Sequence, residues 1–208
     1  MSNISSERRP LALPISLLIS GALGLLAAWE LTLEKFATLA DPGHVPSCNL
    51  GILIGCSTNL ASWQGRVFFG IPNPLIGVAC WPVVITIAVL LLANARLARW
   101  VWLGLNAGLL FAISWVGWLI FQSIYVLDVL CPWCMLTWAV TIVAFLAVTA
   151  RNLHEGTFGA APLRIGAWMS GSLPLLTVAC YGLIIVLAQL QINAIPRVIA
   201  DLQSYFTR

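Results

Sequence analysis

Cys131 and Cys134 enclose a proline and a tryptophan, and this Cys-x-x-Cys motif lies where one long apolar stretch of the chain gives way to another. A motif of this kind can be a redox centre, an inert disulfide or half of a zinc site. Because nearly all its neighbours are apolar, a redox-active pair here would lie at a membrane surface. It could then accept electrons from the aqueous side and pass them to an acceptor dissolved in the lipid.

A second cysteine pair, Cys48 and Cys56, lies in the long connection of residues 34–74. Thiol–disulfide exchange requires a thiolate that can reach a disulfide, so a pair in a long loop suits an electron shuttle. Two alternatives remain open on this basis. The loop pair could form only a disulfide that staples the loop, or it could bind zinc together with Cys131 and Cys134, although the seven residues between Cys48 and Cys56 fit zinc knuckles poorly.

The other two of the six cysteines, Cys80 and Cys180, fall inside apolar stretches. A single cysteine in such a stretch usually serves as a small core residue. We therefore expect both to be packing residues without a redox role.

The elements that must position the cysteines are membrane-spanning helices. Of the 208 residues, 61% are hydrophobic and 8% are charged, whereas about 25% are charged in a typical soluble protein. A span needs about 20 mainly apolar residues and must be helical, because the lipid core offers no water to the backbone. The sequence therefore predicts an all-α integral membrane protein, with a long outer loop between the first two helices. Five stretches qualify as spans: Leu11–Leu33, Leu75–Ala93, Val101–Ile124, Cys131–Ala150 and Gly166–Gln189.

Lysine and arginine indicate the orientation of these helices, because cytoplasmic segments carry an excess of both. With the N-terminus inside, the inner set is Arg8, Arg9, Arg96, Arg99, Arg151 and Arg164, and the outer set is Lys35, Arg66, Arg197 and Arg208. This orientation places both cysteine pairs on the outer side, which is the oxidising side in bacteria. We therefore expect a multi-pass protein of the bacterial inner (plasma) membrane, with a cytoplasmic N-terminus and a periplasmic or extracellular C-terminus.

The motif at Cys131 begins the fourth span, and the start of a helix suits a reactive thiol. The helix dipole and the free amide groups of the first turn stabilise a thiolate. Pro132 fits the first helical turn, and Trp133 suits the membrane interface. Since Cys134 lies one turn deeper, we expect Cys131 to face the aqueous partner and Cys134 to face an acceptor on the lipid side.

Three motifs together resemble the vitamin K epoxide reductase family, and its bacterial members in particular. They are Cys48-x7-Cys56, the segment Gly-Ile-Pro-Asn-Pro-Leu-Ile-Gly at 70–77, and Cys131-Pro-Trp-Cys134. The resemblance covers roughly Leu11–Ala150 and implies a four-helix catalytic bundle. On this basis the chain divides into a core at 1–150 with its outer loop at 34–74, an inner loop and fifth helix at 151–190, and a tail at 191–208. The apolar residues of the tail recur at helical spacing, which predicts an interfacial amphipathic helix.

The resemblance also implies a mechanism and a partner. Cys48 would form a mixed disulfide with a periplasmic thioredoxin-like protein, Cys56 would exchange with Cys131, and Cys134 would reduce a quinone, either menaquinone or ubiquinone. Many bacterial members carry a fused thioredoxin-like domain after the fifth helix. Because this chain stops at Arg208, we expect the thioredoxin-like partner to be a separate protein. The resting disulfide could be the loop pair, a Cys56–Cys131 bridge or the closed Cys-x-x-Cys pair.

Two further positions match residues that contact quinone in the family. Asn73 corresponds to an asparagine thought to hydrogen-bond a quinone oxygen, and the alternative is a turn residue between its two prolines. Trp138 stands where vertebrate members carry a tyrosine, and it could instead be an aromatic residue of the core or the lipid face. An indole N–H can only donate a hydrogen bond, so vertebrate-like sensitivity to anticoagulants is not expected.

Several polar residues near these motifs have simpler explanations. Ser57 matches a serine of vertebrate members, and we expect it to be the N-cap of a short helix over residues 59–64. Asp128 is expected to be a solvated carboxylate at the interface. His44 and His154 lack the partners that a metal site or a catalytic base would require.

We expect a membrane thiol:quinone oxidoreductase that supports disulfide bond formation. The net charge of +3 reflects the membrane topology and gives no reason to propose a nucleic-acid partner. One alternative is reduction of a quinone epoxide. Another is a non-catalytic scaffold or a transporter with structural disulfides, although transporters usually place ionisable groups at mid-span and these spans have almost none.

Overall fold

The computed structural model describes residues 11–159 and 163–206, and five of its helices are long and apolar enough to cross a membrane. These helices correspond to the five predicted spans, and they confirm an all-α, multi-pass membrane protein. Arg8, Arg9 and Arg208, which entered the orientation argument, lie outside the described residues. The five helices are α1 (Ala12–Ala40), α3 (Asn73–Leu92), α4 (Arg99–Tyr125), α5 (Pro132–His154) and α6 (Leu163–Ile192).

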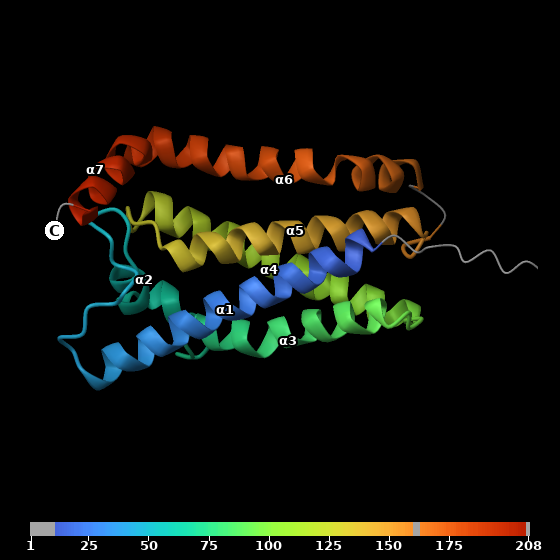
Figure 1. Cartoon of the computed structure of the whole chain (residues 1–208), viewed down its shortest axis with the longest axis horizontal. Helices are drawn as coiled ribbons and strands as arrows, with labels where there is room; N and C mark the ends of the chain where they lie inside the picture. Colours follow the sequence, from blue (N-terminus) through green and yellow to red (C-terminus); the bar gives the residue numbers. More distant parts are fainter. Residues whose placement is uncertain (1–10, 160–162, 207–208) are drawn as a thin grey trace, which may run out of the picture.

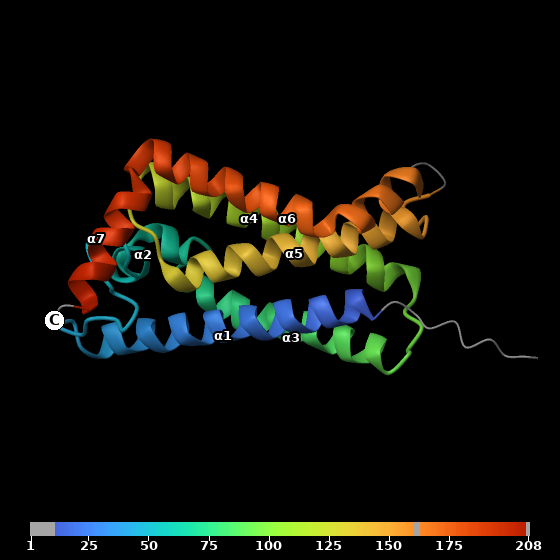
Figure 2. The ribbon, with the colours of Figure 1, turned by 45° about the horizontal axis from the view of Figure 1, so that its top comes forward.

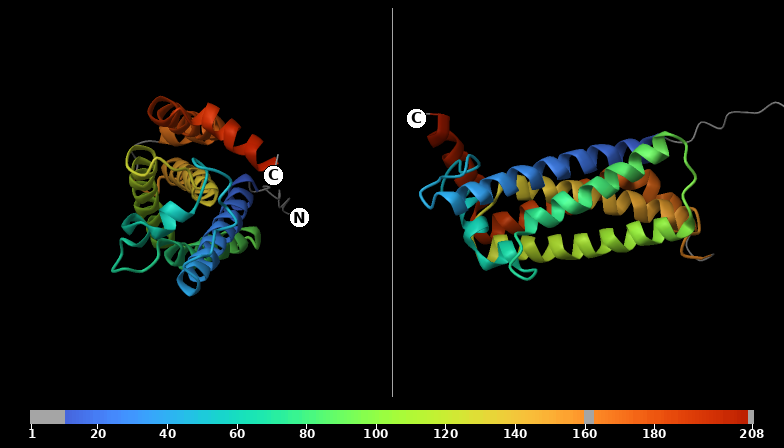
Figure 3. Two further views of the ribbon diagram at one scale, coloured as in Figure 1. Left: turned by 90° about the vertical axis from the view of Figure 1, so that its left-hand side faces the viewer. Right: turned by 90° about the horizontal axis from the view of Figure 1, so that it is seen from below.

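Four of the helices form a bundle, and α6 covers one side of it. The packing runs from α3 to α1, from α1 to α5 and from α5 to α4, while α6 lies against α5 (Figures 1 and 3). Both cysteine pairs lie at one end of the bundle, here called the cysteine end, with residues 41–72 and 126–131. The cysteine end is on the left in Figure 1.

The contact between α1 and α3 depends on glycine. A Cβ atom on Gly24 would lie 2.2 Å from the ring of Trp81, and a Cβ atom on Gly77 would lie 2.8 Å from the Cβ atom of Ala28. Small residues of this kind let membrane helices approach closely, so that van der Waals packing holds them together. The buried core around this contact includes Leu17, Val84, Ala88, Val140 and Val148.

Helix α1 continues to Ala40, whereas the predicted span ends at Leu33. Glu34 and Lys35 mark the end of the apolar stretch but not the end of the helix. Their side chains hold the loop instead, because Lys35 Nζ donates to the Leu60 carbonyl at 2.6 Å and Glu34 accepts from the Ser47 amide at 3.0 Å. The last turns of α1 therefore form a wall for the loop beside the cysteines.

Two short helices lie within the loop, α2 (Ser57–Ala61) and the 3-10 helix η1 (Trp63–Arg66). The prediction that Ser57 caps a helix over 59–64 is wrong, because Ser57 is the first residue of α2. Asn49 supplies the acceptor across the loop: its Oδ1 accepts from the amides of Cys56 at 2.7 Å and Ser57 at 3.2 Å, and its Nδ2 donates to the Ser57 hydroxyl. Local sequence spacing cannot reveal a partner that reaches across a loop.

The chain ends in α7 (Ala194–Phe206), which crosses the cysteine end of the bundle (Figure 2). Ala194 and Val198 pack in a cluster with Leu53 of the loop, while Ile195 and Ile199 are exposed. The tail is therefore helical as expected. It also covers part of the loop, a contact for which the spacing of its apolar residues gives no indication.

Candidate active site

The loop cysteines are joined. Cys48 and Cys56 form a disulfide with their Cα atoms 5.8 Å apart, and both side chains are buried. Of the three resting patterns considered from sequence, this is the closed loop pair. Asn49 closes the same loop from within, through its bonds to the backbone at Cys56 and Ser57.

Cys131 lies directly against this disulfide. Its Sγ atom is 3.3 Å from Cys56 Sγ, and both residues have no exposed surface. The expectation that Cys131 faces the aqueous partner is therefore wrong, since the disulfide and the loop cover it. Cys131 is the N-cap residue of α5 and accepts from the Cys134 amide at 3.4 Å, an arrangement that favours a thiolate.

Backbone hydrogen bonds hold the two cysteine segments side by side. Leu130 N–H donates to the Leu53 carbonyl at 2.8 Å, and Gly55 N–H donates to the Leu130 carbonyl at 3.1 Å. Ile54 and Leu130 thus form a short parallel bridge. Because Cys56 and Cys131 each follow this bridge within two residues, it sets the distance between their sulfur atoms.

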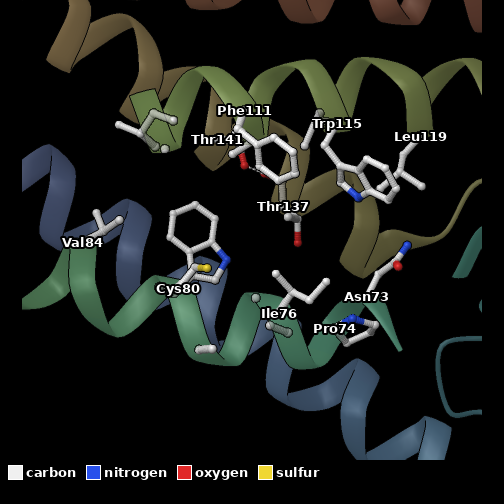
Figure 4. A pocket seen from close by; sticks show the side chains of 18 of the residues that line it. Asn73, Pro74, Ile76, Cys80, Val84, Phe111, Trp115, Leu119, Thr137 and Thr141 are labelled. Atoms are coloured by element: carbon white, nitrogen blue, oxygen red, sulfur yellow. Dashed lines mark hydrogen bonds between the residues drawn. The ribbon is translucent and has the colours of Figure 1, made fainter. Parts of the chain in front are cut away.

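A cavity of about 560 Å³ opens on the other side of the Cys-x-x-Cys pair. Cys134 lines it, whereas Cys131 does not. Figure 4 shows Ile76 and Cys80 on α3 facing Phe111 and Trp115 on α4, with Thr137 of α5 behind them. A largely apolar cavity of this size, with a few polar groups, is typical of a site for a small apolar ligand.

The family model of the vitamin K epoxide reductase family matches residues 15–149, which include most of the bundle and all four of these cysteines. The chain belongs to the vitamin K epoxide reductase family. Comparison with curated proteins gives no match. Membership makes the chain a membrane oxidoreductase that works on quinones and disulfides. The cysteines and the cavity therefore belong to one candidate site.

Both residues expected from the family to contact quinone line the cavity. The Asn73 side chain also ties down the neighbouring loop, since Nδ2 donates to the Gln64 carbonyl at 2.7 Å and Oδ1 accepts from the Val67 amide at 3.3 Å. A carboxamide has two donor hydrogens and two acceptor lone pairs, so half of the capacity of Asn73 remains. Trp138 is 2% exposed and is packed in the bundle.

Two other polar residues of the cavity, Asn59 and Gln64, were not predicted from the sequence. The Asn59 Nδ2 atom and the Gln64 Oε1 atom are buried without a hydrogen-bond partner among the described residues, and both residues line the cavity. Buried polar atoms in proteins are nearly always paired, so these two fit a ligand that offers both an acceptor and a donor. A quinone has carbonyl acceptors, and its reduced form has hydroxyl donors. Neither residue belongs to a recognisable motif.

The remaining cysteines are not packing residues of the core. Cys80 and Cys180 are both exposed and unbonded, and Cys80 also lines the cavity. The expectation of small core residues is wrong because apolar composition does not distinguish the inner face of a membrane helix from its lipid face.

Asp128 is exposed, as expected of an interfacial carboxylate. His44 contacts Glu34 at 2.7 Å, so it helps to fix the end of α1 to the loop.

Proposed function

We propose that the chain is a thiol:quinone oxidoreductase that reoxidises a separate periplasmic thioredoxin-like protein and reduces a membrane quinone. One observation carries this proposal: the 3.3 Å contact between Cys56 Sγ and Cys131 Sγ joins a loop disulfide to a Cys-x-x-Cys pair whose second member, Cys134, lines the cavity. Electrons can pass along this line of sulfur atoms without any large rearrangement of the bundle.

The first exchange takes place in the loop. A thiolate of the partner attacks Cys48, which breaks the Cys48–Cys56 bond and leaves Cys56 as a thiolate. The second thiol of the partner then attacks the mixed disulfide and releases Cys48. The partner becomes a disulfide, and the loop pair holds the two electrons as thiols. Such steps require that the attacking thiolate reach the sulfur, and of the two buried loop cysteines Cys48 is 7% exposed while Cys56 has no exposed surface.

The second exchange takes place between the pairs. The Cys56 thiolate attacks Cys131 of a Cys131–Cys134 disulfide, and Cys134 leaves as a thiolate. Cys48 then attacks Cys56, which restores the loop disulfide and releases Cys131. The described state has a bonded loop pair and an unbonded Cys-x-x-Cys pair, which is the state expected after this exchange.

The last step closes the Cys131–Cys134 disulfide again. A quinone in the cavity supplies a two-electron acceptor, either menaquinone or ubiquinone, and becomes a quinol with the two protons of the dithiol. The apolar walls of α3 and α4 would hold the ring and its chain. Asn59 Nδ2 would donate to one carbonyl oxygen, and Gln64 Oε1 would accept from the hydroxyl that forms. Val83 and Phe111 line the cavity and are also exposed, so the ligand could enter from the lipid between α3 and α4.

Reconstituted protein tests the proposal. The protein is placed in lipid nanodiscs with a reduced thioredoxin-like protein and a quinone, and quinol formation is followed by absorbance. Wild type should form one quinol for each disulfide made in the partner. Cys48→Ala, Cys131→Ala and Cys134→Ala should each abolish turnover, while Cys180→Ala on the exposed side of α6 should not change it. Quinol formation by Cys134→Ala at the wild-type rate would exclude the mechanism.

A further inference from the structure

Helix α7 lies beyond the residues matched by the family and makes an unusual contact with the loop. The Asp201 carboxylate accepts from three consecutive backbone amides: Oδ1 accepts from Ile52 at 3.1 Å, and Oδ2 accepts from Leu53 at 2.8 Å and from Ile54 at 3.1 Å. The side chain is 8% exposed. Hydrogen bonds to an ionised acceptor are stronger than those between neutral groups, so this contact holds one loop segment by three strong bonds.

The loop backbone is shaped to receive the carboxylate. Gly51 N–H donates to the Ile54 carbonyl at 3.1 Å, which turns the three amides toward α7. A Cβ atom on Gly51 would lie 2.1 Å from the Asp201 carboxyl carbon. Any larger residue at position 51 would therefore push the carboxylate away from the amides.

The segment held by Asp201 is also the segment that sets the distance between the reacting sulfur atoms. Leu53 and Gly55 exchange backbone hydrogen bonds with Leu130, next to Cys131, and Cys56 follows Gly55 directly. The loop segment of residues 52–55 is thus held by Asp201 on one side and by Leu130 on the other. Asp201 does not line the cavity. Loss of its contact should therefore change the distance between the sulfur atoms without changing the binding of a ligand in the cavity.

The ionisation of Asp201 agrees with this geometry. Burial opposes the charged form, but hydrogen bonds from the amides of Ile54, Leu53 and Ile52 outweigh it, so the pKa of Asp201 lies below its ordinary value. The facing residues Gly51, Ile52, Leu53 and Ile54 carry no titratable side chain, and Arg197 lies one turn earlier on α7. The carboxylate is therefore ionised at neutral pH.

We propose that Asp201 is a positioning residue that holds Cys56 against Cys131 for disulfide exchange. This inference rests on the proposed function, because it concerns the exchange step of that mechanism. Without the carboxylate, the amides of Ile52, Leu53 and Ile54 lose their shared acceptor, and the loop segment of residues 52–55 moves away from Leu130. Exchange between the two cysteine pairs then slows, while the cavity and its affinity for quinone stay as they are.

The test compares Asp201→Asn and Gly51→Ala with the control Arg197→Gln, an exposed charge on the same helix. Asn has the same shape, but it turns an N–H group toward backbone donors. Gly51→Ala disturbs the same contact from the loop side. Quinol formation from a reduced thioredoxin-like protein is measured over a range of quinone concentrations. We expect kcat to fall about tenfold in both variants, the effect of losing about one charge-assisted hydrogen bond, with an unchanged KM for quinone and no effect of Arg197→Gln.

A second readout traps the exchange itself. In a Cys48→Ala background the Cys56–Cys131 disulfide should accumulate, and mass mapping measures its fraction. Asp201→Asn should lower that fraction. In the Cys48→Ala variant that retains Asp201, the fraction should also fall in acid, because the pKa of Asp201 is lowered in the folded protein. The contact is complete above the unfolded-state pKa and is lost as pH drops through the lower folded-state value. Asp201→Asn should lack this acid limb.

The outcomes separate the two proposals. If wild type forms no quinol, the proposed function fails. If wild type is active and Asp201→Asn keeps its kcat and its trapped fraction, the role of Asp201 is overturned. A variant that also raises the KM for quinone shows a general structural effect, and this result overturns the positioning role as well. Asp201→Glu, which keeps the charge, should recover part of the activity if positioning by the carboxylate is correct.

Discussion

Cys56 has two sulfur neighbours, Cys48 in its own disulfide and Cys131 at 3.3 Å. The order in which these bonds form determines where electrons accumulate. Of the two cysteines of the Cys-x-x-Cys pair, Cys131 is the one whose thiolate form is stabilised, because it accepts a hydrogen bond from the amide of Cys134. A variant that removes one neighbour of Cys56 should therefore stop the relay at a defined bond.

The Cys48→Ala variant makes this testable. Cys56 can still exchange with Cys131, but Cys48 is no longer there to attack Cys56 and release Cys131, so the Cys56–Cys131 disulfide should become the main species after oxidation. Mass mapping of the membrane-extracted protein identifies the bond. Cys180→Ala is the control and should retain the loop disulfide. Recovery of a Cys131–Cys134 disulfide in place of the bridge would contradict the exchange route.

The unpaired amide of Asn59 leads to a second prediction at this scale. If Asn59 Nδ2 donates to a quinone carbonyl, Asn59→Leu should raise the KM for quinone about tenfold, the cost of one buried hydrogen bond. Exchange with the thiol partner should be unaffected, because Asn59 takes no part in it. Ser114→Ala, which removes an exposed hydroxyl bonded within its own helix, serves as the control. An unchanged KM would show that another residue orients the ligand.

At the scale of the elements, the most extensive contact in the bundle joins α1 and α3. This contact also forms the floor of the cavity, since Ala28 and Trp81 line it. Gly24 permits the contact, because any side chain there would overlap the Trp81 ring. The shape of the cavity thus depends on a residue that carries no chemistry of its own.

Gly24→Ala should lower the stability of the bundle. Its Cβ atom would lie 2.2 Å from Trp81, and overpacking of this kind costs about 1–3 kcal/mol. The melting temperature in detergent and the KM for quinone should both report the change. Gly117→Ala on α4 is matched to it in size, and a Cβ atom there meets nothing within 4 Å. Equal melting temperatures for the two variants would show that α1 and α3 can move apart freely.

At the scale of the whole molecule, the site requires two sides that differ in environment. The loop disulfide lies at the cysteine end, and the cavity lies within the bundle. The relay therefore runs from the end of the protein toward the lipid. Its direction in the cell depends on which membrane face the cysteine end occupies, and the proposed orientation assigns it to the periplasm.

Labelling of single cysteines tests this orientation. Val45 is 69% exposed at the cysteine end, and Phe158 is 46% exposed at the other end. In a background without other cysteines, Val45→Cys should react with a membrane-impermeant maleimide in intact bacterial spheroplasts. Phe158→Cys should react only after the membrane is opened. The reverse pattern would place the site on the cytoplasmic side and exclude a periplasmic partner.

Much of the fold could be predicted from the sequence, because a lipid environment leaves an apolar stretch of sufficient length no choice but a helix. The five spans and the start of α5 beside Cys131 follow from this rule. The end of α1 does not, since Glu34 and Lys35 leave the apolar pattern while the backbone remains helical to Ala40. The cap of α2 was also missed, because its acceptor comes from Asn49.

For the site, the three sequence motifs, through the family that they resemble, led to the prediction that two cysteine pairs and a quinone-binding bundle belong together. The tertiary structure decided which atoms meet: that Cys131 is covered by the loop disulfide, that Asp201 holds the loop, and that the Asn59 Nδ2 and Gln64 Oε1 atoms have no hydrogen-bond partner among the described residues. These contacts join residues far apart in the chain, and the distances between them depend on packing and on backbone hydrogen bonds. A motif records the identity of the reacting groups, but only the packed chain brings them within reach of one another.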